Sequence, residues 1–355
     1  MKRKKQYFAP TMGAVQEVER MRKVLAPIVQ QHFGNAWQLR QLTIEVPKKR
    51  LMRYKIEAYH PAENRTLKWR LIGKVYSPTN LMQKGVEIIQ QLWDEGFNRD
   101  SQDGISIPEH VAYLPDLSLL LMEEIMGRPL RQMINDGTAS QQDMDSFARA
   151  TVKLHQSSVR PERTYSVHDQ LESCKPRPDQ FCQELPEFAA NVQEIIETAR
   201  ACQDQLPQDV RKPIHGDYHP GQVHIDNGRV WILDLDKIKF ADPAHDIAEV
   251  VLFLKRKERK ARRADYIHGL RDTFFQTYFD RMGWDIAGRI PLYEALIHLK
   301  RACKLYRMQN GENWRDEMQM LIQQGHTCIS VLKQSPREMN LDRAIQAYEA
   351  CPGWV

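Results

Sequence analysis

The sequence predicts an α+β protein with a strand-rich N-terminal part and a larger, mainly helical C-terminal part. Apolar and polar residues alternate over short segments between residues 42 and 122, the pattern of strands with one buried face. Beyond residue 143, apolar residues instead recur every three or four positions, as on the buried face of a helix. With 355 residues, of which 42% are hydrophobic, the chain can bury a full core.

The N-terminal part begins with a helical pattern and continues with strands. Residues 14–32 carry apolar residues at helical spacing, so we expect a helix there. Three strands follow, at 42–46, 51–60 and 66–76. A helix is expected over 81–96, with Gly96 as its C-terminal cap. Two more strands are expected, near 105–114 and 117–122.

The C-terminal part is dominated by helical patterns. Four prolines and no clear period predict a loop-rich insertion over 157–186. Helices are expected on either side of it and after residue 246, at 143–155, 188–205, 247–257, 266–282, 292–308, 314–333 and 341–350.

Two polar motifs in the C-terminal part are separated by a predicted hairpin. HGDYHPGQ occupies 215–222, and LDLD occupies 233–236. Between them, two short strand patterns flank Asp-Asn-Gly-Arg, a strong signal for a tight turn. A hairpin there would bring Asp217 and Asp234 to the same end of its strands.

These residue types suit phosphoryl transfer. That reaction needs one carboxylate to accept or orient the proton of the attacking hydroxyl, and further oxygen ligands to hold the metal that neutralises the phosphates. Asp217, Gln222 and Asp234 could supply those groups.

The segment that starts at His215, HGDYHPGQVHIDNGRVWILDLDKIKFADPAHDIAEV, resembles the catalytic segment of the aminoglycoside phosphotransferase and choline kinase superfamily. These are small-molecule kinases with a protein-kinase-like fold, and their pattern is HGDxxxxN followed by a strand and IDxxxxxxxDxxxD. The maltokinase branch, with HGDYHLGQV, is the most similar variant and also has Gln in place of Asn. The resemblance implies a catalytic base at Asp217, metal ligands at Gln222 and Asp234, and the two later acids at Asp242 and Asp246.

The resemblance also implies two lobes and a nucleotide site. The expected parts are an N-terminal helical extension at 1–40 packed on the small lobe, an N-lobe at 41–124 and a C-lobe at 125–355. Lys74 takes the place of the strand lysine that pairs with the phosphates, and Glu87 that of its helix partner, with Lys68 and Glu95 as alternatives. The backbone of the hinge residues Glu123, Glu124 and Ile125 would contact the adenine.

Two features of this chain depart from simple expectations. No GxGxxG motif occurs in the small lobe, and the basic turn at 47–50 is either its replacement over the phosphates or a soluble hairpin. Asp236 lies two residues after Asp234, which on a strand would place both on one face. Asp236 could therefore reach a second metal or accept hydrogen bonds from backbone amides.

Charge narrows the range of partners. The formal net charge is +5, so the protein is mildly basic. The sequence lacks the basic pattern interleaved with aromatic residues that is typical of proteins that bind single-stranded nucleic acid. Residues 255–263 hold seven basic side chains, and more follow at helical spacing from Lys300 to Arg307. Such clusters form a solvated helix face or contact an anionic substrate, an acidic partner or nucleic acid. A site for polycationic aminoglycosides would instead need carboxylates.

Composition also indicates the compartment. Six cysteines without a CxxC pair suit reduced thiols. No apolar run is long enough to span a membrane, and the basic N-terminus has no apolar segment after it that would complete a signal peptide. We therefore expect a cytoplasmic protein with no membrane partner.

Together these observations predict a kinase that uses ATP, or another nucleoside triphosphate, and Mg²⁺ to phosphorylate a hydroxyl of a small molecule. A sugar or sugar-like alcohol is the expected acceptor, and an aminoglycoside or amino alcohol is the alternative. A protein kinase is disfavoured because the glycine loop and an APE segment are missing. A nucleotide-binding pseudokinase scaffold is disfavoured by the intact Asp217 and Asp234. We do not expect a nucleic acid partner, and the sequence does not indicate an oligomeric state.

Overall fold

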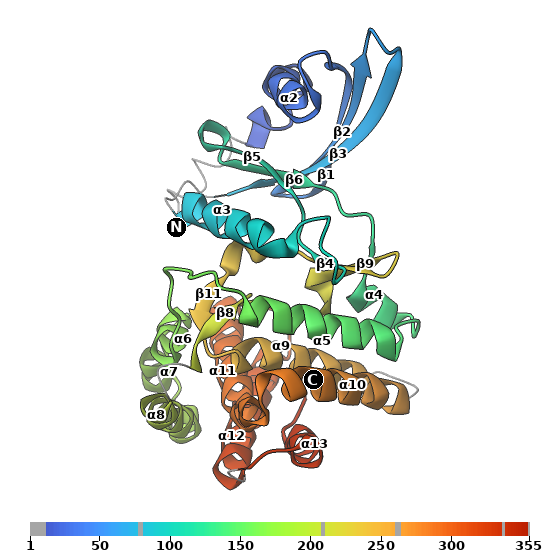
Figure 1. Cartoon of the computed structure of the whole chain (residues 1–355). Coiled ribbons are helices and arrows are strands. Elements are labelled where there is room, and N and C mark those ends of the chain that lie inside the picture. The colour runs from blue at the N-terminus through green and yellow to red at the C-terminus, as the bar shows by residue number, and fades with distance from the viewer. Residues whose placement is uncertain (1–11, 77–80, 207–209, 260–263, 336–337, 354–355) are drawn as a thin grey trace. The chain divides into compact units, whose positions relative to one another are not determined.

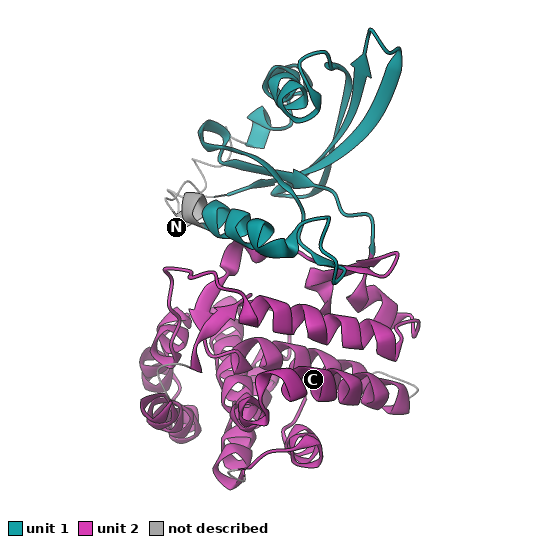
Figure 2. Ribbon diagram, in the orientation of Figure 1, with its two compact units in different colours: residues 1–127 teal, residues 128–355 magenta. Residues whose placement is uncertain are grey.

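The computed structural model describes residues 12–76, 81–206, 210–259, 264–335 and 338–353. The chain divides into two compact units, residues 1–127 and 128–355 (Figure 1, Figure 2). The first is built on an antiparallel sheet and the second is mainly helical, as the sequence predicts.

Unit 1 contains a five-stranded antiparallel sheet with strand order β1-β2-β3-β6-β5. The bounds of these strands are β1 Gln38–Lys48, β2 Leu51–His60, β3 Arg65–Val75, β5 His110–Leu114 and β6 Leu119–Glu123. Every second residue of the central part of β2 is buried, which is the period that a half-buried strand requires. The predicted N-terminal helix is confirmed as α2, Val18–Phe33, and its apolar stripe shares one hydrophobic cluster with the sheet.

The segment after β3 differs from the expected pattern at two places. Helix α3, Leu81–Leu92, runs into a π-helical turn at Trp93–Phe97, where Gly96 has a φ of 90°. The helix is kinked at this residue. Glycine is favoured there because residues with a side chain rarely adopt such a φ. The strand expected over 105–114 is two strands, β4 at Ile105–Ser106 and β5, because Pro108 between them has no N–H to donate to a ladder.

Unit 2 contains the predicted late helices at nearly the expected positions. Their bounds are α5 Gln141–Gln156, α8 Ala189–Gln205, α9 Ala244–Glu258, α10 Ala264–Met282, α11 Ile290–Met308, α12 Trp314–Gln334 and α13 Leu341–Ala350. A short helix that the sequence did not predict, α4 Leu130–Asn135, precedes them. Helix α11 is buried along most of its first three turns and packs against α12, α9 and α8. It therefore forms the centre of the helical core.

The prediction of a loop-rich insertion over 157–186 was wrong, because this segment contains two short helices. They are α6, Val167–Ser173, and α7, Pro178–Glu184. Pro178 lies in the first turn of α7, where its missing N–H has no intrahelical partner to lose. Ser166 and Asp169 form a capping box that begins α6. The number of prolines in a segment does not exclude a helix, because a proline in the first turn is compatible with one.

The predicted hairpin is confirmed as β9, Val223–Asp226, and β10, Arg229–Ile232. Both turn residues, Asn227 and Gly228, have positive φ values of 50° and 80°, as a type I′ turn requires. Two short pairings that the sequence did not predict complete this region. Strand β7, Arg128–Pro129, pairs with β9, and β8, Lys212–Ile214, pairs with β11, Lys239–Ala241. Within the described ranges, no helix has the length and apolar character needed to cross a bilayer.

Candidate active site

The backbone of the HGD motif is held by one buried carboxylate, Asp246. The amides of His215 and Gly216 donate to its two oxygens, at 2.7 and 2.9 Å. Asp246 lies in the first turn of α9, where a negative charge also interacts favourably with the helix dipole. The later acid of the sequence pattern thus anchors the loop that carries Asp217.

Two residues that the sequence did not single out complete this anchor. His155 on α5 places Nε2 at 3.3 Å from Asp246 and Nδ1 at 2.8 Å from the hydroxyl of Tyr278 on α10. Burial by itself raises the pKa of Asp246, but hydrogen bonds and charge from His155 and His245 outweigh it and hold the pKa well below its ordinary value. Asp246 therefore stays ionised at neutral pH in the core.

His215 supports the loop and is not positioned for proton transfer. Its Nε2 lies 2.7 Å from the carbonyl oxygen of Leu233, which can only accept a hydrogen bond. The imidazole therefore carries a proton on Nε2 and ties the HGD motif to the residue that precedes Asp234.

Gly216 allows the loop to pass close to β11. Its φ is 79°, and a Cβ atom there would lie 2.5 Å from Cε of Lys239 and 2.9 Å from the carbonyl oxygen of Lys237. Both the conformation and the space thus require glycine.

Asp217, the predicted base, follows this glycine and is half-buried. Its Oδ2 forms an ion pair with Nζ of Lys237. Burial raises the pKa of Asp217, but the hydrogen bond and charge of Lys237, with smaller effects of His219 and His215, bring the pKa below its ordinary value. The carboxylate is therefore ionised and ready to accept a hydrogen bond. No motif or spacing in the sequence marks Lys237 as a partner of Asp217.

The predicted metal ligands Gln222 and Asp234 lie together. The hairpin register pairs Val223 with Ile232, and the amide of Leu233 donates to the carbonyl oxygen of Gln222 at 2.8 Å. The side-chain nitrogen of Gln222 donates to Oδ2 of Asp234 at 3.4 Å. Carboxylate and amide oxygens are ligands that Mg²⁺ accepts, and the amide can turn its oxygen to the same side. The pair fits a divalent cation.

The backbone at Asp234 corrects the expectation for Asp236. Strand β10 ends at Ile232, Asp234 has a left-handed conformation with φ of 64°, and Leu235–Lys237 form a 3-10 turn. Because the chain is not a strand here, a spacing of two residues does not place Asp236 on the same face as Asp234. The backbone geometry therefore does not support a second metal site at Asp236.

Asp242 has a structural role in this fold. Its two carboxylate oxygens accept hydrogen bonds from Nε and one terminal nitrogen of Arg289, at 2.8 and 3.3 Å. The amide of Ala244, the first residue of α9, donates to it at 3.0 Å. Asp242 thus orients the start of α9, on which Asp246 lies one turn later.

The strand and helix residues predicted for phosphate binding lie in unit 1. The Nζ atom of Lys74 on β3 lies 5.2 Å from the centre of the Tyr76 ring. Glu87 is exposed on α3, and it makes no ion pair with any residue in the described part of the chain. The pairing of Glu87 with Lys74 stays a prediction, and the alternatives Lys68 and Glu95 are exposed.

The three hinge candidates differ in what their backbones can still bind. The amide of Glu123 donates to the carbonyl of Glu109, and that of Glu124 donates to the carbonyl of Arg70. Among the described residues, the amide of Ile125 has no acceptor. The carboxylates of Glu123 and Glu124 form ion pairs with Arg99 and Arg53. Of the three, Ile125 therefore has the amide that remains for a ligand.

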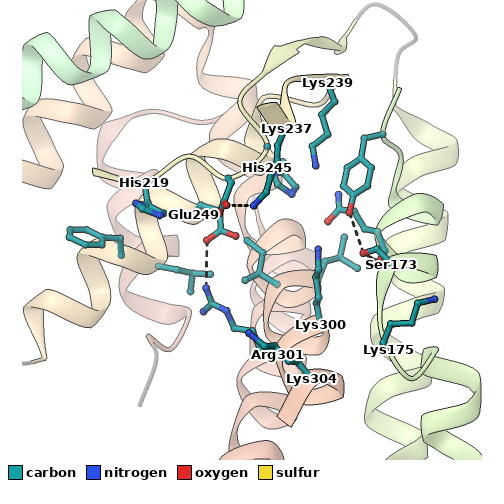
Figure 3. A pocket seen from close by; sticks show the side chains of 18 of the residues that line it. Ser173, Lys175, His219, Lys237, Lys239, His245, Glu249, Lys300, Arg301 and Lys304 are labelled. Atoms are coloured by element: carbon teal, nitrogen blue, oxygen red, sulfur yellow. Dashed lines mark hydrogen bonds and ion pairs between the residues drawn. The ribbon is translucent and has the colours of Figure 1, made fainter. Parts of the chain in front are cut away.

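A cavity of about 730 Å³ lies beside Asp217, entirely within unit 2 (Figure 3). Gly216, Asp217 and Lys237 form one wall, and apolar residues of α9 and α11 contribute another. Its volume is that of an ordinary small-molecule site.

Cations dominate the lining of this cavity. Helix α11 contributes four of them, Lys300, Arg301, Lys304 and Arg307. Six more come from other elements and loops, namely Arg131, Arg163, Lys175, Lys237, Lys239 and Arg256. The only carboxylates among the described lining residues are Asp217 and Glu249. The cationic row predicted from the spacing on α11 therefore faces a cavity.

The basic run at 255–263 is divided by the fold. Arg256 lines the cavity, whereas Lys255 is 4% exposed and donates to Glu294 at 2.6 Å. Residues 260–263 of the run lie outside the described residues. Glu294 also lies near Cys328 and Cys351, a group with metal-ligand chemistry. The ammonium of Lys255 already balances the charge of Glu294, which makes this cluster part of the core.

Comparison with known proteins identifies the family. The model of the phosphotransferase enzyme family (APH) matches residues 65–284, which is more than half of the chain. The chain belongs to this family, and it is a small-molecule kinase. No curated protein is similar enough to the chain to count as a match. The narrower resemblance to maltokinases stays a prediction.

Solved structures of kinases share the fold. The amicoumacin kinase hAmiN, in complex with AMP-PNP, Ca²⁺ and Ami, is 15% identical with a TM-score of 0.56, over 93% of this chain and 98% of that one. A choline kinase from Cryptosporidium parvum Iowa II is 9% identical, with a TM-score of 0.55 over 90% and 96%. A choline/ethanolamine kinase family protein from Mesorhizobium loti is 13% identical, with a TM-score of 0.52 over 87% and 92%. The protein-kinase-like fold is thereby confirmed.

We predict that Asp246→Ala destabilises the protein by about 3–5 kcal/mol at neutral pH, because it leaves the amides of His215 and Gly216 and the buried His155 without their acceptor. The pKa of Asp246 is depressed in the folded state, so its contribution is present above the ordinary carboxyl pKa and is lost as pH falls below about 4. Urea unfolding at pH 7 and at acidic pH measures both effects. The exposed Asp204→Ala is the control and should change stability by less than about 0.5 kcal/mol. Equal stability of the two variants at pH 7 would contradict the anchoring role.

Proposed function

We propose that this kinase uses Mg-ATP to phosphorylate a hydroxyl of a small molecule that binds in the cavity beside Asp217. The observation that carries the proposal is that Asp217, the carboxylate in the HGD motif, lines a cavity of small-molecule size and is held ionised by Lys237. A sugar or sugar-like alcohol suits a cavity with both polar and apolar walls.

The roles of this chain's residues follow from their contacts. Asp217 accepts a hydrogen bond from the acceptor hydroxyl and takes its proton late, because the transition state of phosphoryl transfer is loose. Lys237, beside Asp217, stabilises negative charge on the transferred group. Gln222 and Asp234 would hold Mg²⁺, which when bound neutralises the phosphates. In unit 1, Lys74 is proposed to orient the phosphates and the Ile125 amide to contact the adenine.

Two rival functions are less consistent with the site. An aminoglycoside kinase needs carboxylates around its polycationic acceptor, whereas ten Lys and Arg side chains line this cavity. A pseudokinase scaffold has no need for the ionised Asp217 and the Gln222–Asp234 pair. The cysteines that the structure describes are all free thiols, which supports a reducing compartment, and we propose the cytoplasm.

The base is tested by Asp217→Asn, which keeps the shape of the side chain and removes its proton affinity. We expect kcat to fall by roughly 10²–10⁴-fold, with nucleotide binding retained. Steady-state ADP release and calorimetric ATP titration measure the two effects, with Asp204→Asn as an exposed control. A variant with near-normal kcat would remove Asp217 from the mechanism.

The pH dependence tests the Asp217–Lys237 pair. The wild-type rate should stay constant as pH falls from neutrality and decline only below the ordinary carboxyl range, because Lys237 depresses the pKa of Asp217. In Lys237→Met, burial becomes the main effect on the pKa of Asp217 and raises it, so the acidic limb of kcat/KM should move to higher pH. In Lys237→Arg the positive charge is kept, so the acidic limb should stay at low pH. An acidic limb at the same pH in all three proteins is the contradicting result.

The metal site is tested by Asp234→Ala. This change should abolish the difference between ATP affinity with Mg²⁺ and with EDTA, because the charge that holds the ion is gone. Asp226→Ala, in the same hairpin, is the matched control. Unchanged Mg-ATP affinity in Asp234→Ala would show that the ion is held elsewhere.

A further inference from the structure

The cavity beside Asp217 has far more positive than negative charge. Both of its described carboxylates already have cationic partners, Lys237 for Asp217 and Arg301 for Glu249 at 3.6 Å. Most of the remaining cations have no carboxylate within 4.0 Å among the described residues. These are Arg131, Arg163, Lys175, Lys239, Lys300, Lys304 and Arg307. An excess of like charge around a concave site disfavours folding unless a ligand of opposite charge binds there.

The arrangement is more than a solvated helix face. Lys300, Lys304 and Arg307 follow one another at i, i+4 and i+7 along α11, which taken alone could be such a face. Lys239 comes from β11, and Figure 3 shows Lys239 and Lys300 extending into the same space from opposite sides. Arg163 lies before α6, in a third part of the chain. Elements far apart in sequence therefore converge on one space with the same charge.

Lys239 is the most informative of these cations because it is only 6% exposed. Its Nζ lies 3.4 Å from the centre of the Tyr165 ring, and no described carboxylate lies within 4.0 Å of it. Burial, with smaller contributions from the charges of Lys300, Arg163 and Lys237, lowers its pKa to about 8 against the opposing effect of Asp246. A buried ammonium of this kind is costly without an anion, and the cavity provides the space for one.

The cations are on the acceptor side of Asp217. Gly216, Asp217 and Lys237 line the cavity, whereas Gln222 and Asp234 are absent from its described lining. The pair that would hold the metal, and through it the phosphates of the nucleotide, therefore lies outside this space. The nucleotide alone does not account for the row on α11.

We propose that the acceptor is an anionic hydroxyl compound, with phosphate or carboxylate groups bound by Lys239 and the α11 row of Lys300, Lys304 and Arg307 while its hydroxyl contacts Asp217. This inference rests on the proposed function and specifies its substrate class. Neutral sugars would leave the cations unbalanced, and amino sugars or aminoglycosides would be repelled. The reaction transfers the terminal phosphoryl group of ATP to the acceptor oxygen, releases ADP, and passes the hydroxyl proton to Asp217.

A matched set of sugars tests the charge requirement. Glucose is neutral, glucosamine is cationic, glucuronate has a carboxylate and glucose 6-phosphate has a phosphate. Calorimetric affinities and ATP-dependent ADP release are measured for all four with the full-length protein. We expect at least one anionic member to bind tenfold or more tighter than glucose and glucosamine, and to weaken as salt increases. The comparison of glucuronate with glucose 6-phosphate shows which anionic group is preferred.

The assignment to particular residues is tested by the double variant Lys300→Gln, Lys304→Gln. We expect affinity for the anionic sugar to fall roughly 10- to 100-fold, because two charge-assisted contacts are lost, with ATP affinity unchanged. Lys333→Gln combined with Arg315→Gln removes two exposed cations of α12 outside the cavity and is the matched control. That control should bind like the wild type.

The outcomes separate this inference from the proposed function. If the anionic sugars bind but none of the four sugars causes ATP to be converted to ADP, the anion site is supported and the kinase proposal is overturned. Turnover of glucose or glucosamine in preference to the anionic sugars would support the kinase proposal and overturn the anion site. Three other results would also overturn the anion site. They are equal binding of all four sugars, no binding of the two anionic sugars, and loss of ATP affinity instead of sugar affinity in the α11 double variant.

Discussion

The candidate active site depends on one buried anion, Asp246. Its two oxygens accept hydrogen bonds from the amides of His215 and Gly216, and His155 connects it to α5 and, through Tyr278, to α10. Burying a carboxylate is costly, and these donors offset that cost only because they are all directed at it. As a result, the loop that bears Asp217 is attached to the helical core. The bond from His215 to the carbonyl of Leu233 then transmits this position to the segment that carries Asp234.

Charge is distributed differently on the two sides of Asp217. Gln222 and Asp234 form an oxygen-rich pair suited to a cation, and the neighbouring cavity is lined by cations suited to an anion. Lys237 lies at the boundary, where it keeps Asp217 ionised and contributes to the cavity wall. In the proposed mechanism, the charges that select the acceptor come from α11, β11 and Arg163, none of which belongs to the HGD motif itself. This separation explains why the catalytic motif indicates a reaction but does not identify a substrate.

Local patterns predicted much of the fold because they act over a few residues. The turn at Asn227-Gly228 requires two positive φ values, which few residue pairs tolerate, so the hairpin could be expected. Its register, which the structure shows, then places Gln222 beside Asp234. The failures arose where position mattered more than composition. Pro178 starts α7 and does not interrupt it, and Asp234 in a left-handed conformation ends the strand on which Asp236 was expected to lie.

By itself, the sequence determined the α+β class and the hairpin, and it indicated the candidate base at Asp217 and the candidate metal ligands Gln222 and Asp234, because residue type and short spacing specify these features. Only the tertiary structure decided which of the many basic residues share a space. Lys255 lies in the core with Glu294, whereas Arg256, the next residue, lines the cavity with Lys239 and Lys300. It also decided that His155 supports Asp246 from 91 residues away. Electrostatic interactions depend on distance and burial in three dimensions, and neither quantity is encoded in the order of charges along the chain.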